Sequence, residues 1–209
     1  APTPAIKPFA PSRPIPTRWA GSAACGTGYR TCGRRATTRL ADLESCDALL
    51  VVTPAQHVRS VLQGADFGTR PLVLCAKGIE ADSRLLMSEL VAKLAPRASV
   101  SVLSGPTFAH EVARGLPTAV TLASADDAVG DALAARLALP AFRPYRSDDV
   151  VGAEIGGAGK NVLAIASGAV EGRGLGQNAR AALISRGFAE MTRFGLARGA
   201  RAETLAGLS

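Results

Sequence analysis

The chain has 209 residues, of which 47% are hydrophobic and 20% are charged, an ordinary balance for a globular protein with a substantial core. Its formal net charge of +7 favours a nucleic-acid-binding protein until the charges are located. Residues 1–39 hold seven basic side chains and no acidic one, so the two signs are equal in number over the rest of the chain. We therefore expect no nucleic-acid partner. The alternative, a basic nucleic-acid-binding protein, would be supported by steeply salt-dependent DNA binding.

Residues 1–35 are rich in proline, arginine, alanine and glycine and show no sustained apolar period. We expect this segment to be atypical or disordered. No run in the chain approaches the roughly 20 apolar residues of a membrane span. The spacing of the four cysteines suits neither a paired CxxC metal site nor a small disulfide scaffold. We therefore predict a cytoplasmic protein without a metal site or a membrane span.

From position 36, apolar runs alternate with amphipathic stretches. Apolar runs that end in turn signals predict buried strands, at about residues 47–54, 71–80, 99–104, 118–124 and 141–147. Helices are expected between them, at about residues 55–63, 83–94, from Pro106 onwards, and 126–139. This alternation predicts an α/β fold with a partial Rossmann-type parallel sheet, whose ligands bind at the carboxyl ends of the strands.

After Asp148 the pattern is helical only. Two helices are expected, at about residues 150–170 and 178–198, separated by the glycine-rich sequence EGRGLGQ. We therefore assign residues 36–148 to an incomplete dinucleotide-binding domain and residues 149–209 to the start of an all-helical substrate domain.

Lys160 lies in the first of these helices, inside the small and apolar segment VGAEIGGAGKN. Each interior glycine costs a helix roughly 1 kcal/mol relative to alanine, so the glycines beside Lys160 indicate the close approach of backbone or ligand. Four apolar neighbours recur at the spacing of one buried helical face: Ile155, Val162, Leu163 and Ile165. A lysine withdrawn from water can exchange a proton near neutral pH, which suits oxidation of a secondary alcohol. The alternative is a lysine that reaches solvent from a helix end.

The sequence GAEIGGAGKN, followed by GLGQNARAALISRGFAEMTRFG, closely resembles the start of the helical domain of NAD(P)-dependent glycerol-3-phosphate dehydrogenases. LCAKGIE and SGPTFAHEVARG resemble two further motifs of that family, and the resemblance covers about residues 36–209. It implies NAD(P)H-linked, reversible reduction of dihydroxyacetone phosphate to sn-glycerol 3-phosphate, the entry to glycerophospholipid synthesis. It implies NAD(H) or NADP(H) as the cofactor and a small-molecule substrate as the partner, and it is compatible with a homodimer.

The resemblance also implies roles for two lysines and their neighbours. Lys160 would be the catalytic acid/base and bind substrate, with Asn161 beside it in the substrate site. Lys77, at the carboxyl end of a predicted strand, would reach both cofactor and substrate. From position alone, Lys77 sits where anions collect, and a solvated strand-end lysine is the alternative.

In SGPTFA, the resemblance implies that Gly105 and Thr107 face the glycerol phosphate and that Ala109 faces the cofactor. The residues themselves fit a polar ligand, because glycine permits close backbone approach and free N–H groups at a helix start favour anions. A simple strand-to-helix turn is the alternative.

Two parts of the family pattern are not found. The sequence GTGYRTCG at residues 26–33 lacks the spacing of the GxGxxG loop that holds the cofactor pyrophosphate, and the Ser-Arg-Asn segment that holds the substrate phosphate does not occur by Ser209. We therefore expect this chain by itself to bind dinucleotide weakly and to show little or no dehydrogenase activity. A related 3-hydroxyacid dehydrogenase is the alternative enzyme, which substrate profiling would distinguish.

Overall fold

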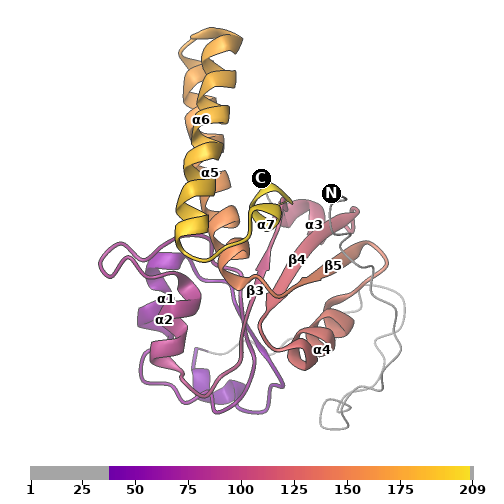
Figure 1. The fold of residues 1–209 in the computed structure, drawn as a ribbon. Coiled ribbons are helices and arrows are strands. Elements are labelled where there is room, and N and C mark those ends of the chain that lie inside the picture. The colour runs from indigo at the N-terminus through magenta and orange to yellow at the C-terminus, as the bar shows by residue number, and fades with distance from the viewer. Residues whose placement is uncertain (1–37, 208–209) are drawn as a thin grey trace.

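The computed structural model describes residues 38–207, which form a five-stranded sheet, helices on both of its faces and a long helical hairpin (Figure 1). The predicted segment 1–35 lies outside the described residues. The change from alternating strands and helices to helices alone falls between Ser147 and Val150. The expected α/β fold with a helical carboxyl-terminal part is therefore confirmed.

The sheet has the order β1–β2–β3–β4–β5, with strands at Leu49–Val51, Leu72–Leu74, Val100–Ser104, Thr118–Ser124 and Phe142–Ser147. The first three strands are parallel to one another, and β4 is parallel to β5. Between β3 and β4 the pairing is antiparallel, with Ser101 opposite Ser124. An entirely parallel sheet was the wrong expectation at this one pair.

The reason for the antiparallel pair is the short connection between β3 and β4. Its only helix, α3, spans Ala109–Ala113. Five residues of helix rise only about 7 Å, which is too short to carry the chain back across the sheet for a parallel return. The chain therefore turns back after α3 and enters β4 from the carboxyl end of β3, which makes the two strands antiparallel.

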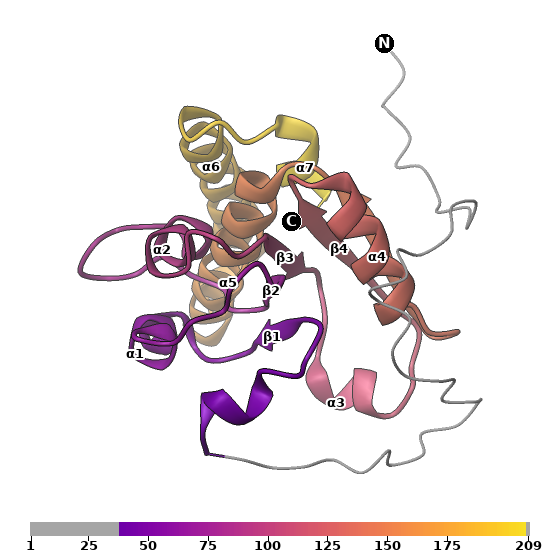
Figure 2. The same cartoon turned by 90° about the horizontal axis from the view of Figure 1, so that it is seen from below.

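Alternating side chains of the central strands supply the core on both faces of the sheet. Leu72 and Leu74 of β2 pack with α1 (Val58–Leu62), its preceding 3-10 turn (Ala55–His57) and α2 (Met87–Leu94). Val73 points to the other face and packs with α4 (Asp127–Leu137). Figure 2 shows α1 and α2 on one side of the sheet and α4 on the other.

The helical part consists of α5 (Val150–Gly172), α6 (Gly176–Ala197) and α7 (Ala202–Gly207). Helices α5 and α6 form an antiparallel hairpin that extends well beyond the sheet, whereas α7 folds back beside the base of α5 (Figure 1). Asp149 fixes this base, because its carboxylate accepts the backbone N–H groups of both Gly152 and Arg201 at 2.7 and 2.8 Å. The 3-10 turn Leu40–Leu43 precedes β1.

Two local predictions were wrong. The helix expected from Pro106 begins only at Ala109, because the Thr107 N–H donates to the Gly105 carbonyl in a tight turn and Phe108 is extended. The expected single apolar face of α5 is also not buried as a whole. Ile155 is 2% exposed, but Val162 and Ile165 are 66% and 75% exposed, because α5 beyond Lys160 projects past the sheet.

Candidate functional site

The candidate site lies at the carboxyl ends of β2 and β3. Lys77 follows β2, and Gly105 follows β3 directly, so two neighbouring parallel strands bring them to the same edge. Gly105 is buried, and a side chain there would press on the backbone of β4 at Val120, 3.1 Å away. Glycine is therefore needed at this position to let β3 and β4 lie close together.

Both lysines bind the same backbone oxygen. Lys77 Nζ donates to the Gly105 carbonyl at 3.0 Å, and Lys160 Nζ donates to it at 3.3 Å. The two side-chain nitrogens therefore lie within two hydrogen-bond lengths of each other. The structure thus brings together three residues that the sequence predicted: Lys77 after β2, Gly105 after β3 and Lys160 on α5. They meet at the Gly105 carbonyl.

The approach of α5 depends on the glycines before Lys160. A Cβ atom at Gly157 would lie 2.5 Å from Ser104 Oγ and 3.8 Å from Lys77 Cγ. A Cβ atom at Gly159 would overlap the Met191 sulfur on α6. The glycine run therefore serves close packing on two sides, which explains its presence in the middle of a helix.

Burial changes the acid–base properties at this edge. It lowers the pKa of Lys77, and the positive charge of Lys160 lowers it further. Burial also raises the pKa of the neighbouring Cys75 thiol to about 11, against the opposing effect of Lys77. A lysine amine with a lowered pKa is neutral in a larger fraction of molecules and can accept a proton more readily.

The segment that carries Lys77 is held from outside the site. Gln56 bridges it, since its side chain donates to the Ile79 carbonyl at 2.8 Å and accepts the Ala81 N–H at 2.9 Å. The Arg59 guanidinium donates two hydrogen bonds to buried Glu80. That pairing, with help from Ser83, lowers the pKa of Glu80 to about 2. These contacts fix the backbone after β2 and hence the origin of the Lys77 side chain.

The side chains of the remaining predicted residues do not contact the Gly105 carbonyl oxygen. Thr107 is half-buried and bonds through its backbone to Gly105, and Ala109 is exposed as the first residue of α3. Asn161 is exposed on α5 one residue beyond Lys160. The structure brings none of these three side chains to the shared oxygen, and their ligand roles stay predictions.

Sequence reasoning missed three residues that shape the site. Ser104 is buried beneath Gly157, and Glu154 of α5 accepts two hydrogen bonds from Ser88 of α2. A glutamate inside the apolar run before Lys160 was an available signal, because a buried carboxylate requires partners. Its partner, 66 positions away, could not be read from the sequence.

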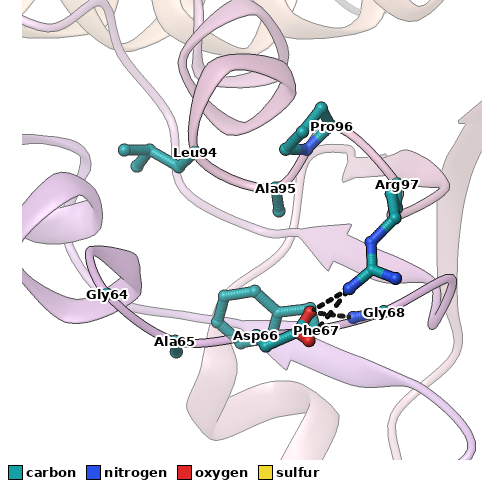
Figure 3. Close-up of a pocket in the computed structure, with 9 residues that line it drawn as sticks. All are labelled: Gly64, Ala65, Asp66, Phe67, Gly68, Leu94, Ala95, Pro96 and Arg97. Carbon is teal, nitrogen blue, oxygen red and sulfur yellow. Dashed lines mark hydrogen bonds and ion pairs between the residues drawn. The ribbon is translucent and has the colours of Figure 1, made fainter.

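A hollow lies away from the candidate site, at the opposite, amino-terminal ends of the same strands. It has a volume of about 270 Å³ and is lined by residues 64–68 and 94–97. Figure 3 shows Asp66 at its edge, paired with Arg97 at 2.8 Å and accepting the Gly68 N–H. Both charged side chains are exposed, and this hollow brings together none of the predicted site residues.

Residues 38–207 contain neither a membrane-spanning helix nor a cluster of metal-binding side chains. None of the described helices is both long enough and apolar enough to cross a membrane. No group of three or more histidine, cysteine, aspartate or glutamate side chains in the described part of the chain could hold a metal ion.

Comparison with known proteins identifies the family. The family model for the NAD-dependent glycerol-3-phosphate dehydrogenase N-terminus matches residues 35–130, and that for the C-terminus matches residues 149–209. Glycerol-3-phosphate dehydrogenases (NAD(P)+) from Zymomonas mobilis and Sphingopyxis alaskensis are each 64% identical over 174 residues. These matches cover 83% of this chain but 51% and 53% of the relatives, so the chain spans about half their length.

A solved structure gives the same result. Glycerol-3-phosphate dehydrogenase from Coxiella burnetii superposes with a TM-score of 0.75 at 41% identity, covering 80% of this chain and 52% of that one. The two lysines, the shared carbonyl and the close-packed helix thus occur in a chain whose two parts both match one family in sequence, and whose fold matches a solved member. The chain belongs to the family of NAD-dependent glycerol-3-phosphate dehydrogenases.

Proposed function

We propose that the edge formed by Lys77, Gly105 and Lys160 is the reaction centre for interconversion of dihydroxyacetone phosphate and sn-glycerol 3-phosphate. The observation that carries this proposal is the convergence of two lysine amines on one backbone oxygen. A ketone or alcohol oxygen is also a hydrogen-bond acceptor, so a substrate oxygen can take the place that the Gly105 carbonyl holds between the amines. The relatives' names support this substrate over a 3-hydroxyacid.

The residues at this edge also fit a polar cofactor. Thr53 follows β1 at the same end of the sheet, and its hydroxyl is buried without a hydrogen-bond partner among the described residues. A nicotinamide cofactor, when bound, would supply or accept the hydride at the substrate carbon. Lys77 and Ala109 are the residues proposed to contact it, and the family description supports NAD(H) or NADP(H).

In this proposal the chain's own residues orient the substrate and move a proton. Lys160 Nζ gives a proton to the substrate oxygen during reduction and takes it back during oxidation. Lys77 holds the same oxygen and, being positively charged when protonated, stabilises negative charge that develops there. Thr107 and Asn161 are proposed to orient the rest of the substrate from the two sides of this edge.

The first test is substrate binding to this chain. Dihydroxyacetone phosphate, added to protein labelled with ¹³C at lysine Cε, should shift the signals of Lys77 and Lys160 and leave that of Lys93 in place. Lys93 is a suitable control because it is exposed on α2 and away from this edge. Equal shifts at all three lysines would contradict a specific site.

The second test is catalysis. In a version of the protein extended at both ends to the length of its relatives, Lys160→Ala should lower the rate of NADH- or NADPH-dependent reduction by about 10²–10⁴-fold, the usual cost of removing a positioned acid or base. Lys93→Ala should not change it. Since the chain spans about half of its relatives' length, we expect a low starting rate and weak cofactor binding in a calorimetric titration. Ordinary turnover that survives Lys160→Ala would overturn the assignment.

We further propose that the protein is cytoplasmic, acts on small molecules rather than nucleic acid, and forms a homodimer. Support for a cytoplasmic location comes from Cys46 and Cys75, which are free thiols, as is usual in a reducing compartment. Support for a small-molecule partner comes from the charge balance after residue 39. Support for the third comes from exposed apolar side chains on the hairpin, such as Ile165 and Leu196. Sedimentation at increasing protein concentration tests the homodimer, and a monomer at every concentration would disprove it.

A further inference from the structure

The close packing of α5 leaves a question about how Lys160 is held in place. Helices and sheets usually keep their relative position because side chains of one fit between side chains of the other. Where α5 crosses β3, its surface is Gly157, with only a hydrogen atom facing Ser104. At this crossing no side chain of α5 interlocks with β3. The contacts that set the height of Lys160 therefore lie in the preceding turns of the helix, among them the Asp149 carboxylate at its base and the buried Ile155 side chain.

Glu154 provides a directional contact six residues, or nearly two helical turns, before Lys160. Its Oε1 accepts the Ser88 backbone N–H at 2.8 Å, and its Oε2 accepts the Ser88 hydroxyl at 2.5 Å. Glu154 is only 6% exposed, and burial raises the pKa of its carboxyl against the opposing effect of the Ser88 hydrogen bonds. Two bonds from one residue to both carboxylate oxygens define position and orientation together.

Ser88 is itself tied to the segment that carries Lys77. It lies in the first turn of α2, the next helix after Lys77 in the chain. The start of that helix is joined to the segment after Lys77, because the Glu80 N–H donates to the Leu85 carbonyl at 3.0 Å. The Ser88–Glu154 contact therefore joins the part of the chain that carries one lysine to the helix that carries the other.

We propose that Ser88 and Glu154 are positioning residues, whose pair of hydrogen bonds sets the register of α5 and thereby holds the Lys160 amine beside the Lys77 amine. The inference rests on the proposed function for its meaning in catalysis. Its test does not depend on that function, because it measures only whether the two amines stay close.

The measurement uses the lysines themselves as reporters. The chain has four, Lys7, Lys77, Lys93 and Lys160, so ¹³Cε-lysine NMR gives few signals, and single Lys→Arg variants assign them. Because the charge of Lys160 lowers the pKa of Lys77, Lys160→Met should move the titration midpoint of Lys77 upward. This variant defines the full effect of removing the neighbouring charge.

Ser88→Ala and Glu154→Ala should each shift the Lys77 midpoint upward, toward its value in Lys160→Met. Glu154→Gln should keep the wild-type midpoint, because an amide oxygen still accepts the Ser88 N–H and the amide nitrogen can donate to the hydroxyl. Ser88→Ala removes a single hydroxyl and leaves the Glu154 carboxylate a backbone partner, so it provides the test even if Glu154→Ala does not fold.

Two controls separate positioning from general loosening. Arg146→Ala removes the contacts of β5 with Asp127 and Asp131 of α4, far in the chain from Ser88 and on the other face of the sheet from α2, so it should lower stability and leave the Lys77 midpoint unchanged. In the Lys160→Met background, Ser88→Ala should have no further effect on Lys77, since the charge through which it acts is gone. An additional shift in that background would mean that Ser88 acts on the solvation of Lys77 instead, and would overturn the proposal.

The proposal is also wrong if Lys160→Met shifts Lys77 while Ser88→Ala and Glu154→Ala do not. An unchanged Lys77 in Lys160→Met itself would show that the amines are not close, and there would be nothing to position. Failure of the proposed function has a different signature: dihydroxyacetone phosphate would leave the lysine signals in place, whatever the variants do to the Lys77 midpoint.

Discussion

The α/β part and the helical hairpin use similar amounts of apolar sequence in different ways. In the sheet, alternating residues of one strand are buried on opposite faces, as Leu72 and Val73 are, because helices cover both sides. In the hairpin, burial depends on distance from the sheet. The first turns of α5 are almost wholly buried, whereas Val162 and Ile165 beyond Lys160 are exposed. The same helix is thus buried at its start and exposed at its end, and Lys160 lies where burial gives way to exposure.

The sharpest way to test this difference is a matched pair of isoleucines on α5. Ile155 is 2% exposed and packs with Leu86 and Met191, whereas Ile165 is 75% exposed. Ile155→Ala should lower the free energy of unfolding by about 2–5 kcal/mol, the usual cost of a large-to-small change in a core. Ile165→Ala should change it by less than about 0.5 kcal/mol. Urea denaturation measures both at a protein concentration at which sedimentation shows a monomer, and equal losses there would show that the outer half of α5 is buried within the chain.

A second matched pair uses glycines of the same helix. Gly157→Ala places a methyl group against Ser104 Oγ and should destabilise the protein by about 1–3 kcal/mol, as overpacking does. Gly168→Ala meets nothing within 4 Å and should stabilise the protein by about 0.5–1 kcal/mol, because alanine is the better helix former. Thermal unfolding of the two variants should therefore move in opposite directions. A stabilised Gly157→Ala would disprove the close approach of α5 to β3.

A smaller effect, dependent on pH, is expected in the α/β part. The pKa of Glu80 is lowered to about 2 by Arg59 and Ser83, so its carboxylate form is the one that stabilises the fold. That contribution is complete above the ordinary value of 4.5 and is lost as the pH falls from there toward 2. Glu80→Gln should therefore be less stable than wild type at pH 7, and the difference should shrink below pH 4.5. A difference that does not depend on pH would contradict the ion pair.

The smallest effect is expected for a buried hydroxyl in the middle of the sheet. Ser101 of β3 is fully buried, and its hydroxyl has no hydrogen-bond partner among the described residues. Ser101→Ala should therefore leave stability unchanged or raise it by up to about 1 kcal/mol, because an unpaired buried hydroxyl is unfavourable. Ser124→Ala is the control, since the Ser124 hydroxyl donates to the Asp126 carbonyl and its loss should be unfavourable. A clear loss of stability in Ser101→Ala would indicate an unrecognised partner.

The sequence predicted those elements whose apolar pattern is local. All five strands and the two long helices lie where the patterns of residues 36–198 placed them. Four of the strands are shorter than predicted, whereas the bounds of the two helices differ by one or two residues. Predictions failed where a distant segment decides the outcome. The direction of β4 depends on how far α3 can carry the chain, and the burial of Val162 and Ile165 depends on where the sheet ends.

The same distinction applies to the candidate site. The close approach at the glycines before Lys160 and the strand-end position of Lys77 could be predicted from the local sequence. Both amines do reach the Gly105 carbonyl. The oxygen that joins them, the contact of Gly157 with Ser104 and the contact of Glu154 with Ser88 each need segments that only the folded chain brings together. Pairings of this kind have no signature in a single sequence.

The group that holds the two amines at rest is a backbone carbonyl, and this affects how the site can be lost. A site organised by a side chain disappears when one codon changes, because the substitution removes the acceptor itself. No point substitution removes the Gly105 carbonyl itself. A substitution can disturb the resting arrangement only by changing the two lysines, by changing residues that position them, such as Gly157, or by placing at position 105 a side chain too large for the space beside Val120. The hydrogen-bond acceptor is therefore present whatever residue stands at position 105. A mutation can change only the donors and the side chains around this carbonyl.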